Sequence, residues 1–155
     1  RGIAYACNNQ AAFQGSDGTY YGFAAAFKDM CTCYELSFTS GLPRGKSMVV
    51  QVTNIGDLNS PNHFDLQLPG GGFGENNGCS MPEPGRARLN GPGQWDQSRY
   101  PRSAWGPVSN ENRGGVSSIR MCDSLPGPLQ EGCRIRFNFI GDNPSMRYRQ
   151  VKCPA

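Results

Sequence analysis

The sequence predicts a small, all-β dominated domain: a closed β-barrel with short helices and long surface loops. Alternating apolar runs indicate several strands, and the signals for helix are few. The 155 residues include 21 Gly and 12 Pro and only 17% charged residues, so turns are frequent. Strands separated by such turns are typical of a small barrel. The length fits a single domain over residues 1–155.

The first strands are expected in the N-terminal half. Residues 33–39 alternate, which places Tyr34, Leu36 and Phe38 on one face. Residues 42–45 (LPRG) form a turn. The Val-rich run 47–53 alternates little, as expected of a strand that is covered on both faces.

Three later strands are expected over residues 63–68, 134–140 and 146–153. In the first two, the inward side chains are Phe64, Leu66, Leu68, Ile135, Phe137 and Phe139. The pairs Arg134/Arg136 and Arg147/Arg149 are then interpreted as solvated strand faces.

Two helices are expected. The apolar, Ala-rich segment 21–27 is long enough for two helical turns. Asp123 and Ser124 are candidate caps of a short helix that runs through Leu129 and ends near Gly132.

Residues 80–115 are predicted to be one long surface loop, rich in Pro, Gly and Asn. Trp95, Tyr100 and Trp105 lie within it. These aromatic residues either pin the loop to the barrel or stack on a ligand.

Charge and motifs exclude several function classes. The net charge is +3, and the basic residues are scattered, so no nucleic-acid partner is expected. No segment approaches the length of a membrane span. No phosphate-binding or dinucleotide glycine pattern is present, because residues 70–74 open no helix. We therefore expect no cofactor.

Seven cysteines and a single His favour disulfides over a metal site, so no metal is expected. The spacing of Cys31 and Cys33 matches neither redox nor zinc motifs. The odd number of cysteines leaves at least one thiol free or bonded outside these residues. We expect a secreted, extracellular, monomeric protein.

The chemistry is expected around residues 54–74. If Phe64 and Leu66 point into the core, His63 and Asp65 share the opposite, exposed face, and Asp57 lies just upstream. Paired carboxylates on a groove suit glycoside hydrolysis, where one carboxyl must stay protonated and the other ionised. A neighbouring charge such as Asp57, or apolar packing, would raise the pKa of Asp65. The simpler alternative is that His63 and Asp65 form a hydrogen-bonded surface pair.

Several motifs, in order along nearly the whole chain, resemble the family 45 glycoside hydrolases, which are endoglucanases on a six-stranded double-psi β-barrel. The matching segments are YGFAA (21–25), CTCYELSFTSG (31–41), GDL (56–58), NHFDL (62–66), PGGG (69–72), NGC (77–79), GGVSS (114–118), CDS (122–124), GC (132–133), DNP (142–144) and RQVKCP (149–154).

By this resemblance the chain hydrolyses β-1,4-glucan with inversion, acting on cellulose, with mixed-linkage glucan and glucomannan as further candidates. Asp65 matches the general acid and Asp57 the auxiliary carboxylate of the loop over the cleft. His63 matches a residue beside the acid, and Asp142 matches a carboxylate on the far side of the cleft.

Further substrate contacts are expected from other matched positions. They are Tyr21, Asn62, Gly71 and Gly72. A Gly-rich run such as the last two lets backbone approach a bulky ligand closely.

The resemblance also implies the disulfides Cys33–Cys153 and Cys122–Cys133. It leaves Cys7, Cys31 and Cys79 with partners outside these residues. The family's catalytic base lies in an N-terminal Tyr-Trp-Asp-Cys-Cys segment that these residues do not contain. We therefore expect these 155 residues to bind glucan but to hydrolyse it slowly.

Other departures from the family pattern are Arg113 in place of a cleft Tyr, one added residue between Asp57 and Asp65, and a longer segment over 80–112. Two other functions remain open. One is a non-hydrolytic, expansin-like wall-loosening protein, which shares the barrel and a His-Phe-Asp motif but lacks the opposing base. The other is a carbohydrate-binding or defence module of the barwin type.

Overall fold

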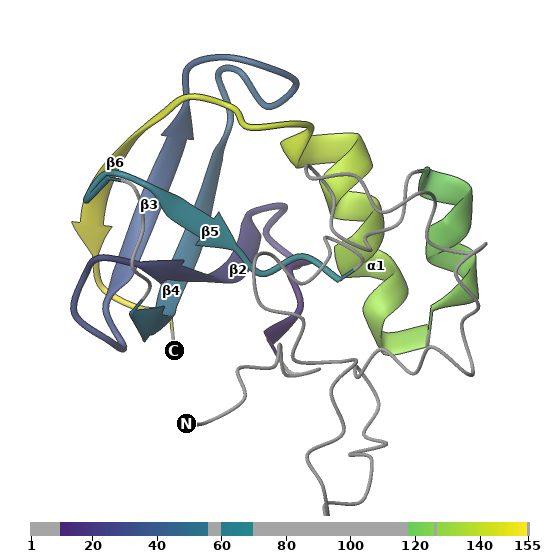
Figure 1. Ribbon diagram of the computed structural model, residues 1–155, viewed down its shortest axis with the longest axis horizontal. Helices are drawn as coiled ribbons and strands as arrows, with labels where there is room; N and C mark the ends of the chain where they lie inside the picture. Colours follow the sequence, from purple (N-terminus) through teal and green to yellow (C-terminus); the bar gives the residue numbers. More distant parts are fainter. Residues whose placement is uncertain (1–9, 56–59, 70–117, 126, 155) are drawn as a thin grey trace, which may run out of the picture.

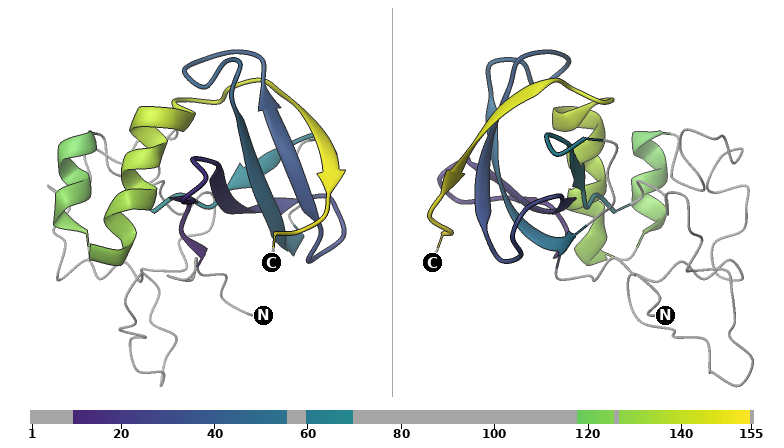
Figure 2. Two further views of the ribbon diagram at one scale, coloured as in Figure 1. Left: turned by 180° about the vertical axis from the view of Figure 1, so that it is seen from behind. Right: turned by 60° about the vertical axis from the view of Figure 1, so that its left-hand side comes forward.

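The computed structural model describes residues 10–55, 60–69, 118–125 and 127–154. Strands dominate this part of the chain, and the helices stand together on one side of the sheet (Figure 1, Figure 2). The strands are β1 (Phe13–Gln14), β2 (Tyr20–Ala26), β3 (Cys33–Phe38), β4 (Ser47–Ile55), β5 (Phe64–Leu66) and β6 (Met146–Val151). The helical segments are η3 (Ile119–Ser124), α1 (Gly127–Ile135) and η4 (Arg136–Ile140). The predicted strand-dominated class is confirmed.

The six strands form one mixed sheet in the order β1-β2-β4-β3-β6, with β5 paired to β2 beside β1. Strands β2 and β4 run parallel, and the other pairs are antiparallel. Among the described residues no ladder joins β5 to β6, so hydrogen bonds do not close the sheet. Side chains bridge this gap instead, because the ring of Phe64 lies 5.2 Å from that of Tyr148.

The alternation predicted for residues 33–39 is confirmed in β3, where Tyr34, Leu36 and Phe38 are buried. The turn over residues 42–45 is also present. Strand β4 differs from its prediction, because it alternates between buried and half-buried residues rather than being covered on both faces.

The helix predicted over residues 21–27 is wrong, because this segment forms β2. Its small residues Gly22, Ala24 and Ala26 recur with a period of two and are all buried. Strand β2 hydrogen-bonds to β4 along its whole length and to β5 at its end, so tertiary pairing overrides the helical preference of alanine.

The strand predicted over residues 134–140 is also wrong, because α1 runs through Ile135 and one π-helical turn continues to Ile140. The buried residues 129, 132, 133, 135, 139 and 140 follow a helical period. The apolar residues 135, 137 and 139 alternate as they would in a strand, which is why the sequence predicted one. Gly141, at φ 68°, ends the turn, and its amide donates to the carbonyl of Arg136.

Gly132 does not stop the helix as predicted, because it lies inside α1. A Cβ there would approach the Ala12 carbonyl oxygen and the Pro69 ring to 2.9 Å each. The absence of a side chain therefore lets α1 pack directly on the segment that follows β5.

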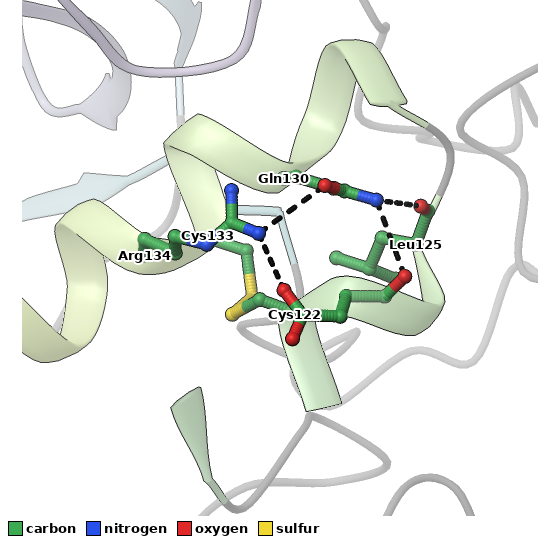
Figure 3. The surroundings of a disulfide bond; sticks show 6 residues. Cys122, Leu125, Gln130, Cys133 and Arg134 are labelled. Atoms are coloured by element: carbon green, nitrogen blue, oxygen red, sulfur yellow. Dashed lines mark hydrogen bonds and ion pairs between the residues drawn. A yellow bond between two sulfur atoms is a disulfide. The ribbon is translucent and has the colours of Figure 1, made fainter. Parts of the chain in front are cut away.

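The two arginines expected on a strand face lie on the helical segment instead. Arg134 forms an ion pair with Asp123 and donates to the Gln130 amide oxygen at 3.2 Å (Figure 3). The Arg136 guanidinium lies 5.1 Å from the centre of the Phe137 ring. On β6, Arg147 and Arg149 are exposed, as predicted.

Two disulfides are present among the described residues, as the resemblance implies. Cys33–Cys153 links β3 to the end of the chain across 120 residues, and Cys122–Cys133 links η3 to α1 (Figure 3). Cys31 is exposed and forms no disulfide, while Cys7 and Cys79 lie outside the described residues. None of the described helices is long and apolar enough to cross a membrane.

Candidate active site

Strand β5 presents one carboxylate to solvent. Phe64 and Leu66 pack against the main core, whereas His63 and Asp65 are exposed. The predicted alternation is confirmed, because successive side chains of a strand point to opposite faces. The packing of Phe64 and Leu66 against the core therefore fixes the outward direction of Asp65.

Pairing with β2 fixes where Asp65 lies along the sheet. Asp65 is directly opposite Ala25, and the flanking pairs are Ala24 with Leu66 and Ala26 with Phe64. The ladder continues beyond β5, because the Gln67 amide donates to the Phe23 carbonyl at 2.8 Å. Because opposite residues of an antiparallel pair share a face, the small methyl group of Ala25 is the nearest side chain across the ladder.

The environment of Asp65 favours its protonated form. Burial raises the pKa of the Asp65 carboxyl above its ordinary value of 3.8, and the charge of His63 acts in the opposite direction. Asp65 is exposed to solvent, and the surrounding protein still removes enough water to disfavour the carboxylate. A carboxyl that is accessible and has a raised pKa is suited to donating a proton to a bound ligand.

An aromatic cluster packs against the core-facing side of β5. The rings of Phe64, Tyr34 and Tyr148 pack edge to face, with centroids 5.2 to 5.9 Å apart. Such packing holds large apolar rings in a definite geometry. Phe64 is the neighbour of Asp65 in the chain, so this cluster fixes the backbone that carries the carboxyl.

The amide oxygen of Asn62 is engaged by the protein itself. The Tyr148 hydroxyl donates to Asn62 Oδ1 at 2.7 Å and accepts from Lys28 Nζ at 3.0 Å. Lys28 and Tyr148 were given no role by the sequence, because positions 120 residues apart show no local pattern that joins them. The only available signal was the inward place of Tyr148 in the alternation of the last strand. The substrate contact expected of Asn62 stays a prediction.

Tyr21 lies further along β2. Its hydroxyl donates to Asp17 Oδ2 at 3.0 Å, and its ring stacks on Phe13 with centroids 5.4 Å apart. Hydrogen bonds from the backbone and hydroxyl of Thr19 and from Tyr21 lower the pKa of Asp17. Tyr21 is four residues from Ala25, about 13 Å along the strand, so the structure does not bring Tyr21 or Asp17 next to Asp65.

Asp142 lies in the loop between η4 and β6. The next residues are tied to the end of β3, because the Thr39 amide donates to the Ser145 carbonyl and the Ser145 amide donates to Ser40 Oγ. This is the end of the sheet where β4 begins, whereas Asp65 aligns with the far end of β4. Asp65 aligns through Ala25 with Asn54 of β4, whereas the end of β3 aligns with Ser47 of β4. These two positions are about 23 Å apart along β4. A substrate contact by Asp142 therefore requires a ligand that extends well beyond Asp65, and it stays a prediction.

The remaining site predictions fall outside the described residues. They concern Asp57, Gly71, Gly72, Arg113 and the loop over 80–115 with its three aromatic residues. Within the described ranges, no three His, Cys, Asp or Glu side chains are grouped closely enough to hold a metal ion.

Comparisons with known proteins agree on one family. The model of glycosyl hydrolase family 45 matches residues 1–155. An endoglucanase of Cryptopygus antarcticus is 43% identical, over 99% of this chain and 64% of its own length. An endoglucanase of Phaedon cochleariae is 38% identical, over 99% of this chain and 60% of its own length.

A solved structure has a similar fold. The crystal structure of a cellulase from the Antarctic springtail Cryptopygus antarcticus superposes with a TM-score of 0.69 at 39% identity, covering 96% of this chain and 66% of the cellulase. The chain thus spans about two thirds or less of the length of each of these relatives.

Proposed function

The chain belongs to glycosyl hydrolase family 45, and on that premise we propose that it is an endo-β-1,4-glucanase in which Asp65 is the general acid. The observation that carries the proposal is the state of Asp65, a solvent-facing carboxyl whose pKa burial raises. Cleavage of a glycosidic bond requires a proton on the leaving oxygen, and a carboxyl with a raised pKa keeps its proton to a higher pH than an ordinary Asp does.

The proposed outcome at the anomeric centre is inversion. Inversion requires a second carboxylate about 6.5–9.5 Å from the acid, with a water molecule between them. Among the described residues, His63 is the charged group that shifts the pKa of Asp65, and no described carboxylate does so. Membership of family 45 supports this outcome, because the resemblance to that family implies inversion.

We further propose that the substrate is an extended β-1,4-glucan, with cellulose first and mixed-linkage glucan or glucomannan as alternatives. The names of the relatives support this class, because they are described as endoglucanases or a cellulase.

The two disulfides support a secreted, extracellular protein, since such bonds persist in oxidising compartments. We propose that the protein acts as a monomer.

The test measures new reducing ends and viscosity loss on carboxymethylcellulose, for the wild-type chain and Asp65→Asn. The expected result is reducing-end release that Asp65→Asn lowers by about 10²–10⁴-fold. Nuclear magnetic resonance of the first products should show the α-anomer, since inversion of a β-bond gives α. Equal release by both proteins would remove Asp65 from the reaction.

A second candidate is non-hydrolytic glucan binding with wall loosening. It is favoured by residues 63–65, because expansin-like proteins share this His-Phe-Asp motif as well as the barrel. Weakening of cellulose paper without any release of reducing ends by the wild-type chain would support this candidate over hydrolysis.

A further inference from the structure

We infer that Lys28, Tyr148 and Asn62 form a hydrogen-bonded chain that positions the turn leading into β5, the strand that carries Asp65, so that Tyr148 is a positioning residue for the acid. The expected effect on the rate rests on the proposed function. The expectation that the Tyr148 hydroxyl fixes the position of this turn does not depend on that function. The three residues come from the β2–β3 connection, from β6 and from the turn before β5.

The geometry gives the chain of hydrogen bonds a direction. Lys28 Nζ donates to the Tyr148 hydroxyl at 3.0 Å, and that hydroxyl donates to Asn62 Oδ1 at 2.7 Å. Lys28 Nζ also lies 4.7 Å from the centre of the Tyr148 ring, so the ring face attracts the ammonium group. A donor with positive charge polarises the hydroxyl and strengthens its bond to Asn62.

Asn62 belongs to a tight turn that leads into β5. The Asn62 amide donates to Ser60 Oγ at 3.2 Å, and the His63 amide donates to the Ser60 carbonyl at 3.1 Å. This turn is exposed, so few packing contacts hold it in place. Among the described residues, the bond from Tyr148 is therefore the long-range hydrogen bond that ties the turn to the body of the sheet.

This bond lies where the sheet is left open. Within the described part of the chain, strand β6 is at one edge of the sheet, and β5 pairs with β2 alone. In Figure 1, β5 begins beside β6 and runs across toward α1. The Tyr148 ring packs on Phe64, and its hydroxyl donates a hydrogen bond to Asn62. The Tyr148 side chain of β6 thus connects β6 to β5 and its preceding turn, although no ladder pairs these two strands among the described residues.

Lys28 influences Asp65 by its hydrogen bond to Tyr148, and its charge does not shift the pKa of Asp65. The causes that shift the pKa of Asp65 are burial and His63, and Lys28 is not among them. Loss of the chain is thus expected to move the carboxyl rather than to change its proton affinity.

The test compares Tyr148→Phe with wild type on two substrates. Cello-oligosaccharide needs protonation of a poor leaving group, whereas a 2,4-dinitrophenyl cello-oligoside releases a phenolate that needs none. We expect Tyr148→Phe to lower kcat on the first by about tenfold, with KM within about twofold, and to leave the second nearly unchanged. A purely structural role would lower both rates equally, and that result, or unchanged kinetics on both, would overturn the inference.

Tyr34→Phe is the matched control. Tyr34 belongs to the same aromatic cluster, and its hydroxyl makes no hydrogen bond among the described residues, so this variant should behave as wild type. Asn62→Ala should add little to Tyr148→Phe, because both changes break the same bond. Fully additive losses would contradict a shared role.

A second measurement separates this inference from the proposed function. Amide hydrogen exchange at His63 should be faster in Tyr148→Phe than in wild type or Tyr34→Phe, because the turn is released. If wild type cleaves neither substrate, the proposed function fails, and exchange alone decides the inference. Unchanged exchange at His63 would overturn it.

Discussion

Asp65 faces Ala25 across the antiparallel pair of β2 and β5, so the candidate acid lies above one of the smallest side chains of the sheet. Bulkier residues at position 25 would occupy the space beside the carboxyl. The pairing depends on register, because a slip of one residue would turn Asp65 into the core. Phe64 and Leu66, packed against the core, prevent that slip.

Asp65→Asn should abolish most of the activity while retaining glucan binding. The amide keeps the shape of the side chain but donates no proton to a leaving oxygen, and the expected loss in kcat is about 10²–10⁴-fold. Binding of cello-oligosaccharide by calorimetry should stay within about threefold of wild type. Asp29→Asn, an exposed change in the β2–β3 connection, is the control and should keep full activity.

His63→Gln should shift the pH profile of kcat/KM. The charge of His63 lowers the pKa of Asp65, so its removal raises that pKa further above the ordinary 3.8. Because the acid must be protonated, activity falls as the pH rises through this pKa. The alkaline limb should therefore move to higher pH in the variant, and a shift to lower pH would contradict the assignment.

The same carboxyl should affect stability. The folded chain holds the Asp65 proton more tightly than the unfolded chain, since the folded pKa is raised. The stability that this proton gives is complete below the ordinary pKa and is lost as the pH rises through the raised value. Asp65→Asn should thus have a higher Tm than wild type near pH 7, and the difference should vanish near pH 3. A difference that persists unchanged at pH 3 would contradict this linkage.

The two disulfides should differ in their contribution to stability. In the chain-entropy model, Cys33–Cys153, which spans 120 residues, constrains the unfolded chain more than Cys122–Cys133, which spans 11. Replacing the first pair by Ser should cost about 4–5 kcal/mol and the second about 3 kcal/mol or less. Urea denaturation measures both, and a larger loss from the short-loop pair would contradict this order. Non-reducing peptide mapping should find Cys153 bonded to Cys33 rather than to Cys31.

Gly132→Ala should destabilise the chain although Ala favours helix. The added Cβ would lie 2.9 Å from the Ala12 carbonyl oxygen and from Pro69 Cδ. Relief of that overlap requires α1 to move away from Pro69, at a cost of about 1–3 kcal/mol by urea denaturation. Gly127→Ala is the matched control, since nothing lies within 4 Å of its Cβ, and its effect should stay within about 0.5 kcal/mol.

Sequence alone determined the features that depend on local alternation. Residues 33–39, 63–68 and 146–153 were predicted as strands, and β3, β5 and β6 lie within those ranges. The exposure of Asp65 followed from the same period of two, because a strand with one buried face must present the other to solvent. The resemblance carried by short motifs, rather than spacing, supplied the disulfide pairing.

Tertiary structure decided the features for which local preference and global packing disagree. Segment 20–26 is Ala-rich and favours helix by itself, but its place between β4 and β5 makes it a strand. Residues 135, 137 and 139 alternate as in a strand, yet helix α1 and its π turn place Ile135 and Phe139 inward together. The hydrogen bonds of Tyr148 to Lys28 and to Asn62 join residues 120 and 86 positions apart. Such contacts leave no periodic trace in a sequence, because they exist only once the chain has folded.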